Sequence, residues 1–169
     1  MALTGFARSC AKHPGGVASI RLIERGDIVD LTYDPIQNCV TQIRASEQFA
    51  EFAFREDEAT YSEESSSDGC RISVTHRLTF SLPGMDPASQ KATKKVSEGA
   101  RNGLIAIVTL QNGTMFLVGY SRRFGFDRPL TLSTIEASSG WSPSDSAGRT
   151  ITLLSQDTDE ALPFTGIIP

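Results

Sequence analysis

The chain has 169 residues and a mass of 18.3 kDa, and it is 39% hydrophobic and 21% charged. A globular chain of this length buries roughly 70% of its unfolded surface, so we expect one domain, residues 1–169, that needs no disulfide or metal to fold. No apolar run approaches the roughly 18 residues of a membrane span. The first ten residues lack the basic and apolar regions of a signal peptide. We therefore expect neither a membrane span nor a signal peptide.

The net charge of −4 is unevenly distributed. Between Glu47 and Asp68, eight acidic residues stand against one base, Arg55, which gives −7 and leaves +3 for the rest of the chain. An acidic block repels nucleic acid, so we expect no sequence-specific binding to it.

The cysteine and histidine contents are low. The three cysteines are odd in number and widely spaced (Cys10, Cys39 and Cys70), which indicates a reducing compartment rather than a disulfide framework. With only two histidines besides, we predict no metal site.

Period-two alternation is the main structural signal, and it predicts four strands in the first third of the chain: 17–24, 27–33, 36–43 and 48–54. It is clearest at 71–82, where an apolar face alternates with a polar one. We expect 48–54 and 71–82 to form a long hairpin, about 47–82. Between them, residues 63–69 are predicted to be a polar loop, within a mobile acidic tip at 56–69.

One helix is predicted at about 86–101. Asp86 is suited to the N-cap and Pro87 to the first helical position, and Asn102-Gly103 ends the pattern. Small apolar residues recur every four positions, which predicts a helix on the surface of the domain; they are Ala88, Ala92, Val96 and Ala100.

Further strands are predicted at 104–110, 114–120, 130–136 and 150–154, with an Asn112-Gly113 hairpin turn and a loop at 138–148. The fold class that follows is mainly β. We expect an antiparallel β-sandwich or barrel with one flanking α-helix.

No catalytic, cofactor-binding or metal-binding residue is predicted, and we expect the chain not to be an enzyme. His13 has no nucleophile placed near it, and His76 interrupts an apolar face, which favours a buried, hydrogen-bonded side chain or a subunit contact. Phosphate-loop and EF-hand patterns are absent. Arg122-Arg123-Phe124-Gly125-Phe126 mixes basic and aromatic residues, and we interpret this segment as a surface turn or a contact between subunits.

Several segments occur in an order that resembles structural proteins of phages and prophages of Bacteroides-type bacteria, and the layout is similar to that of phage tail tube proteins. They are Gly5-Phe6-Ala7-Arg8-Ser9-Cys10, Gly15-Gly16-Val17, Leu78-Thr79-Phe80-Ser81-Leu82, Met85-Asp86-Pro87, Ile105-Ala106-Ile107-Val108, Met115-Phe116-Leu117-Val118-Gly119-Tyr120, Ser144-Asp145-Ser146-Ala147-Gly148, Thr150-Ile151-Thr152-Leu153 and Leu162-Pro163-Phe164.

The resemblance implies a virion protein that is assembled in the bacterial cytoplasm. Its partners would be further copies of itself, in commonly hexameric rings that stack into a hollow DNA conduit, and other tail proteins. A long hairpin often bridges the subunits of such rings. The candidate residues for a subunit contact or the lumen are Phe49, Phe52, Phe54, His76, Arg122, Arg123 and Phe124.

Other functions stay open. Within a tail, the chain could be a tail terminator or neck ring instead of a tube subunit. A different class is a small-ligand or carbohydrate-binding β-barrel, for which Trp141, Tyr120 and Tyr33 are the aromatic candidates. An enclosed cavity of about 300 Å³ or more would favour that class.

Overall fold

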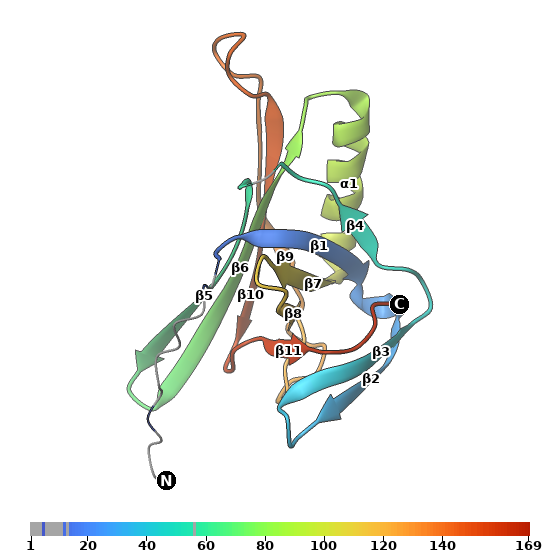
Figure 1. Ribbon diagram of the computed structural model, residues 1–169, viewed down its shortest axis with the longest axis vertical. Helices are drawn as coiled ribbons and strands as arrows, with labels where there is room; N and C mark the ends of the chain where they lie inside the picture. Colours follow the sequence, from blue (N-terminus) through green and yellow to red (C-terminus); the bar gives the residue numbers. More distant parts are fainter. Residues whose placement is uncertain (1–4, 6–11, 13, 56) are drawn as a thin grey trace.

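The computed structural model describes residues 5, 12, 14–55 and 57–169 (Figure 1). Cys10 and His13, together with Glu56 in the predicted acidic tip, lie outside the described residues. The described part contains eleven strands, a short 3-10 helix (Arg25–Asp27) and one α-helix, α1 (Pro87–Asn102). The strands are β1 (Val17–Glu24), β2 (Ile28–Asp34), β3 (Cys39–Ala45), β4 (Ala50–Phe52), β5 (Ala59–Asp68), β6 (Arg71–Pro83), β7 (Leu104–Leu110), β8 (Met115–Val118), β9 (Thr131–Ser138), β10 (Gly148–Asp157) and β11 (Leu162–Phe164).

Two sheets form the domain, and this confirms the prediction of a mainly β sandwich with one flanking helix. The larger sheet has the order β2-β3-β11-β8-β7-β1-β4, and the smaller has the order β5-β6-β10-β9. Strands of the two sheets cross at a steep angle (Figure 1). Every pairing is antiparallel except that of β11 with β3, where Phe164 lies opposite Val40.

The main core lies between the two sheets. Leu78 and Phe80 of β6 and Ile151 of β10 meet Ile20 and Val108 of the larger sheet, and all five side chains are fully buried. A second cluster covers the other face of the larger sheet, where Ile105, Ile107 and Leu117 pack with Phe164. Burial on both faces explains why residues 104–110 are apolar almost throughout.

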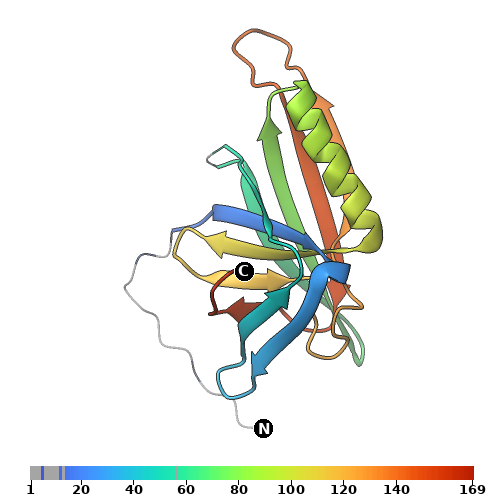
Figure 2. The same ribbon diagram turned by 90° about the vertical axis from the view of Figure 1, so that its right-hand side faces the viewer.

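Helix α1 confirms the predicted caps. The Asp86 side chain accepts a hydrogen bond from the Ser89 N–H (2.8 Å), and Gly103 ends the helix with a φ of 93°. Of the small apolar residues that recur every four positions, Val96 and Ala100 are buried and Ala88 is exposed; the full set of buried positions is Ser89, Thr93, Val96, Gly99 and Ala100. The helix lies along β9 and β10, on the core side of the smaller sheet (Figure 2).

The long hairpin is confirmed, but its predicted bounds were wrong. Its two strands are β5 and β6, which pair from Ala59↔Phe80 to Asp68↔Arg71, so residues 63–68 form a strand instead of a loop. The segment predicted to be its first strand contains β4, which pairs with β1 in the larger sheet. Phe52 lies opposite Ile20 in this pairing, and its ring packs into the main core against Phe80.

Candidate functional site

The outer face of the smaller sheet is a regular polar surface that runs across all four of its strands. Since side chains alternate along a strand, the residues opposite the outward positions of β6 also point outward. No other described element packs on this face, because α1 and the larger sheet lie on the core side. We call it the hydroxyl face, and its residues are Thr60, Ser62, Glu64, Ser66, Asp68, Arg71, Ser73, Thr75, Arg77, Thr79, Ser81, Thr131, Thr134, Glu136, Thr150, Thr152, Leu154 and Gln156.

Hydroxyl groups pair across the strands of this face. Ser66 and Ser73 are 3.0 Å apart at their Oγ atoms, Thr79 and Thr152 are 3.3 Å apart, and Ser81 and Thr150 are 2.8 Å apart. The formal charge is small, because three carboxylates (Glu64, Asp68 and Glu136) stand against two guanidinium groups (Arg71 and Arg77), a net −1. The surface is therefore polar and nearly neutral, with few groups that could hold a phosphate.

Both edges of the smaller sheet are open within the described structure. β5 pairs only with β6, and β9 pairs only with β10. Residues 62–68 of β5 are exposed, as are most residues of β9. An open edge presents unpaired N–H and C=O groups, which a strand of another chain can pair with.

His76 is the buried centre of a polar network between β5, β6 and the segment that leads into β11, and its partners Tyr61 and Glu63 are partly exposed. Its side chain is 4% exposed. Nδ1 lies 3.0 Å from the Tyr61 hydroxyl and 3.5 Å from a Glu63 carboxylate oxygen, and Nε2 lies 3.2 Å from the Asp159 carbonyl. The same Glu63 oxygen accepts hydrogen bonds from the Tyr61 hydroxyl and the Ala161 N–H. Because both ring nitrogens have partners, this network favours a structural role in tying the two sheets together.

The ionisation of this network follows from its contacts. Burial by itself raises the pKa of Glu63, but the hydrogen bonds from His76, Tyr61 and the Ala161 N–H outweigh it and hold the pKa below the usual 4.5. Burial, followed by the neighbouring Glu63 carboxylate, raises the pKa of Tyr61 well above its ordinary range. At neutral pH, Glu63 is therefore a carboxylate and the Tyr61 hydroxyl keeps its proton.

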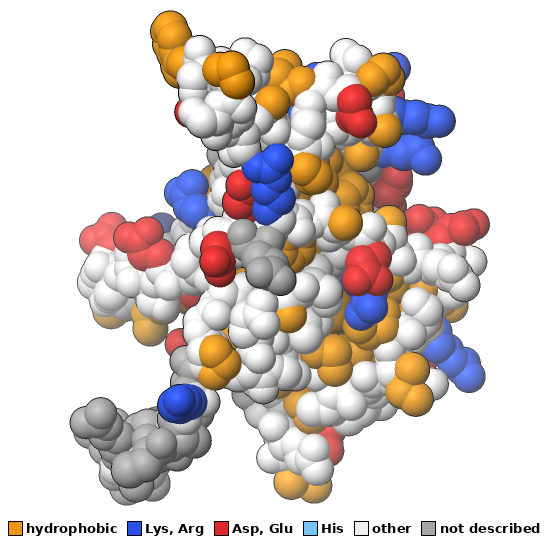
Figure 3. All heavy atoms as spheres, turned by 45° about the horizontal axis from the view of Figure 1, so that its top comes forward, with side chains coloured by type: hydrophobic (Ala, Val, Ile, Leu, Met, Phe, Trp, Pro, Cys, Tyr) orange, Lys and Arg blue, Asp and Glu red, His pale blue; other side chains and the backbone are white. Residues whose placement is uncertain are grey.

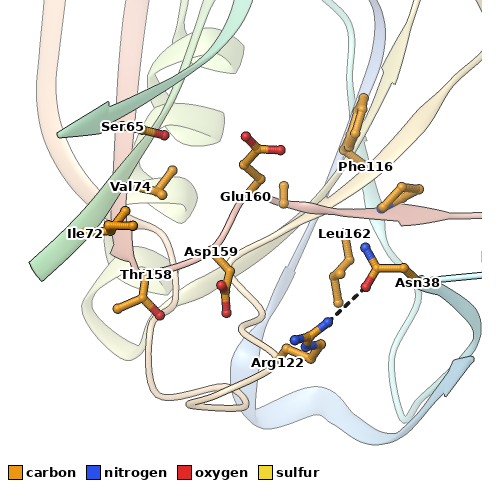
Figure 4. A pocket seen from close by; sticks show the side chains of 12 residues that line it. Asn38, Ser65, Ile72, Val74, Phe116, Arg122, Thr158, Asp159, Glu160 and Leu162 are labelled. Atoms are coloured by element: carbon orange, nitrogen blue, oxygen red, sulfur yellow. Dashed lines mark hydrogen bonds between the residues drawn. The ribbon is translucent and has the colours of Figure 1, made fainter. Parts of the chain in front are cut away.

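A groove opens where the tip of the β5–β6 hairpin faces the chain after β10. It consists of a pocket of about 480 Å³ and an adjoining, more open hollow of about 900 Å³. We call it the end groove (Figure 4). Its lining residues are Asn38, Ser65, Cys70, Arg71, Ile72, Ser73, Val74, Phe116, Arg122, Arg123, Thr158, Asp159, Glu160, Ala161, Leu162 and Pro163.

The basic segment 122–128 forms a tightly held loop on one side of this groove. Ser121 and Gly125 exchange backbone hydrogen bonds of 2.7 Å, and the Ser121 hydroxyl donates to Asp157 (2.8 Å). The guanidinium groups of Arg123 and Arg128 lie 5.5 and 5.0 Å from the centre of the Phe124 ring. Both distances are within the range of a cation–π contact.

The structure separates the candidate contact residues into two groups. Phe49 is buried in the second core cluster, and Phe52 and Phe54 are partly buried against the main core, so most of these rings pack within the chain. Arg122 and Arg123 are exposed beside the end groove. Their predicted role in a subunit contact stays a prediction.

The partners of His76 were not predicted from the sequence. Tyr61 and Glu63 alternate on the strand opposite it and would have been found if residues 59–68 had been assigned to a strand. The carbonyl of Asp159 could not have been found, because it comes from irregular chain 83 residues further on.

The described residues contain no group of three or more His, Cys, Asp or Glu suited to a metal ion. Within the same residues, no helix is both long and apolar enough to cross a membrane. Comparison with family models, curated proteins and solved structures found no match for this chain.

Proposed function

We propose that this chain is a self-assembling virion protein, a subunit of a phage tail tube, whose rings stack into a conduit for DNA. The observation that carries the proposal is the four-stranded smaller sheet, because it combines an uncovered polar face with two open edges. If β5 of one copy pairs with β9 of the next, the smaller sheets of a ring join into one closed barrel. The hydroxyl face then lines the lumen, and α1 lies outside.

The dimensions fit a conduit. Six copies, the number that the resemblance implies, would supply 24 strands. At about 4.8 Å per strand, they give a circumference of about 115 Å and a backbone diameter of about 37 Å before strand tilt widens it. Such a bore leaves room for a double helix within the ring.

The chemistry of the hydroxyl face suits passage of DNA. Hydroxyl groups keep a surface wetted, and the three carboxylates of each copy outnumber its two guanidinium groups, so the face as a whole does not attract phosphates. The end groove carries the arginines of the basic loop, and it lies at the hairpin tip, where a barrel of this kind would have its rim.

The ligand-binding alternative has less support. Trp141 lies in the loop between β9 and β10, whereas Tyr33 is hydrogen-bonded to Asn38 and Tyr120 packs on Phe126, so the three aromatic candidates do not line one pocket. The end groove exceeds 300 Å³, but it is open to solvent and lined by charged and apolar groups together.

Negative-stain microscopy and analytical ultracentrifugation of the purified full chain at increasing concentration test the proposal. We expect rings or tubes on the order of 100 Å across. A species that stays monomeric at every concentration, and also when preformed tail structures are added as nuclei, would contradict the proposal. A monomer that binds a saccharide in a titration would support the alternative.

A further inference from the structure

Trp141 is the most exposed large apolar side chain of the described structure, with a relative exposure of 102%. It lies in the β9–β10 loop, which projects beyond the body of the molecule at one end of its longest axis (Figure 1). Figure 3 shows hydrophobic side chains at this projecting end, separated from one another by polar atoms. Tryptophan is among the residues that contribute most to the binding free energy of protein interfaces.

The loop holds Trp141 in a defined position. One carboxylate oxygen of Asp145 accepts the N–H groups of Trp141 (2.8 Å) and Ser142 (2.9 Å), and these bonds lower the pKa of Asp145. Gly140 adopts a φ of 75° and lies so close to Asp145 that a Cβ there would come within 2.6 Å of the Asp145 Cβ. A loop built in this way loses little conformational freedom when it binds.

The end groove lies at the opposite end of the smaller sheet. Gly148, which follows the loop, pairs with Pro83, whereas Val74 in the groove pairs with Asp157. The nine residue steps from Val74 to Pro83 separate the two by about 30 Å at 3.3 Å per residue. A contact between the loop of one copy and the groove of another therefore joins opposite ends, which generates an extended stack rather than a closed dimer.

The groove is chemically suited to this loop. Ile72, which is 59% exposed, offers an apolar surface, and the Arg122 guanidinium is held in place by Tyr33 (3.3 Å) and Asn38 (3.2 Å), so it can stack on an indole ring. The three arginines of the groove exceed its two carboxylates, and the only charged residue of the loop is Asp145. The charges of the two surfaces are complementary.

We infer that the Trp141 loop of one copy docks into the end groove of a second copy, and that this is the axial contact between stacked rings. The inference rests on the proposed function, which supplies the rings, and it adds the residues that join one ring to the next.

Cys70 lines the groove and is exposed, so it provides a natural thiol for a cross-linking test. We would introduce Ser142→Cys next to Trp141 in a Cys10→Ser background, where Cys39 is buried. Assembled particles are treated with a short bismaleimide and separated on a denaturing gel. We expect a ladder that extends well beyond the dimer, because each copy has one loop and one groove. Adding Cys70→Ser should abolish the ladder, and Lys91→Cys on α1, in place of Ser142→Cys, should give none.

Two results would overturn the axial contact. One is a dimer band alone that survives Cys70→Ser, which would indicate a symmetric contact between two loops. The other is the absence of cross-linking in a sample in which microscopy shows stacked rings. A sample without rings of any kind would contradict the proposed function itself, and the contact with it.

Trp141→Ser gives an independent measurement. We expect rings to form but the stacked fraction to fall at least tenfold in sedimentation, while Val29→Ser, another exposed apolar side chain outside the groove, leaves stacking unchanged. Unchanged stacking of the Trp141→Ser variant would contradict the inference.

Discussion

At the scale of single residues, the network around His76 links the chain segments that the fold must hold together. Glu63 on β5 and His76 on β6 contact the backbone of Ala161 and Asp159, and that backbone leads into β11 of the other sheet. The hydrogen bonds therefore connect the smaller sheet to the larger one, beside the packing of the Tyr61 ring against Phe116 of β8. Removing one partner leaves the others buried and unsatisfied, which costs more than the hydrogen bond itself.

We expect Glu63→Gln to lower the free energy of unfolding at pH 7 by about 1–3 kcal/mol, because the hydrogen bonds to the carboxylate are charge-assisted. The folded pKa of Glu63 is depressed, so its contribution is complete above the ordinary value of 4.5 and is lost as the pH falls through the folded pKa. The difference between wild type and variant should therefore shrink below pH 4.5. Urea unfolding at pH 7 and pH 3 measures it.

Glu64→Gln is the matched control, since Glu64 lies on the opposite, exposed face of the same strand. It should leave stability within about 0.5 kcal/mol of wild type. An equal loss for both variants, or a Glu63→Gln loss that is the same at both pH values, would contradict this account of the network.

At the scale of elements, the stability of helix α1 depends on the glycine at its C-terminal end. Gly103 has a φ of 93°, and a Cβ there would lie 2.4 Å from Cγ of Pro129. We expect Gly103→Ala to lower the free energy of unfolding by at least about 1–3 kcal/mol, from backbone strain before the steric clash is added. Thermal and urea unfolding measure this loss. Gly26→Ala, where a Cβ meets nothing within 4 Å, should be nearly neutral, and similar losses at both sites would show that the explanation is wrong.

The β5–β6 hairpin should be cut by protease at its turn before it is cut within its strands. Because residues 59–68 are paired with β6 along their length, the turn at Gly69 and Cys70 is the exposed end of the element, and we expect proteolysis of the unassembled chain there. Trypsin should cut after Arg71 before it cuts after Arg77, which lies within the paired strands. Mass spectrometry of a time course identifies the first fragment. An earlier cut after Arg77 would indicate that the hairpin is open.

Some helices and strands could be predicted from the sequence, and others could not. The clean alternation of 71–82 predicted β6 and its polar face, and Asp86, Pro87 and Gly103 predicted α1 nearly to the residue. Serine and glutamate have low strand propensity, so β5 was mistaken for a loop, although pairing with β6 makes it a strand. β11 has three residues and a proline, which is too short for any periodicity. The partners of His76 and the end groove arise only from tertiary contacts.

At the scale of the whole molecule, the two faces of the smaller sheet have different surroundings. Its core side is filled by α1 and the larger sheet, and its other side is the hydroxyl face, with one open edge at each end. A closed ring that satisfies both edges must curve the sheet, and the proposed curvature places the hydroxyl face inside and α1 outside. The hydroxyl face is therefore the proposed inner surface of an assembled particle.

Labelling with a maleimide attached to a large polymer tests whether the hydroxyl face lines the lumen. Thr134→Cys places a thiol on the hydroxyl face and Lys91→Cys places one on α1, and both positions are exposed in a single copy. In a Cys10→Ser, Cys70→Ser background, both should react fully in the dissociated chain. In assembled particles, we expect Lys91→Cys to stay reactive and Thr134→Cys to be protected at least tenfold, because the polymer cannot enter the lumen. Equal reactivity at both positions, or protection at Lys91→Cys alone, would contradict the account.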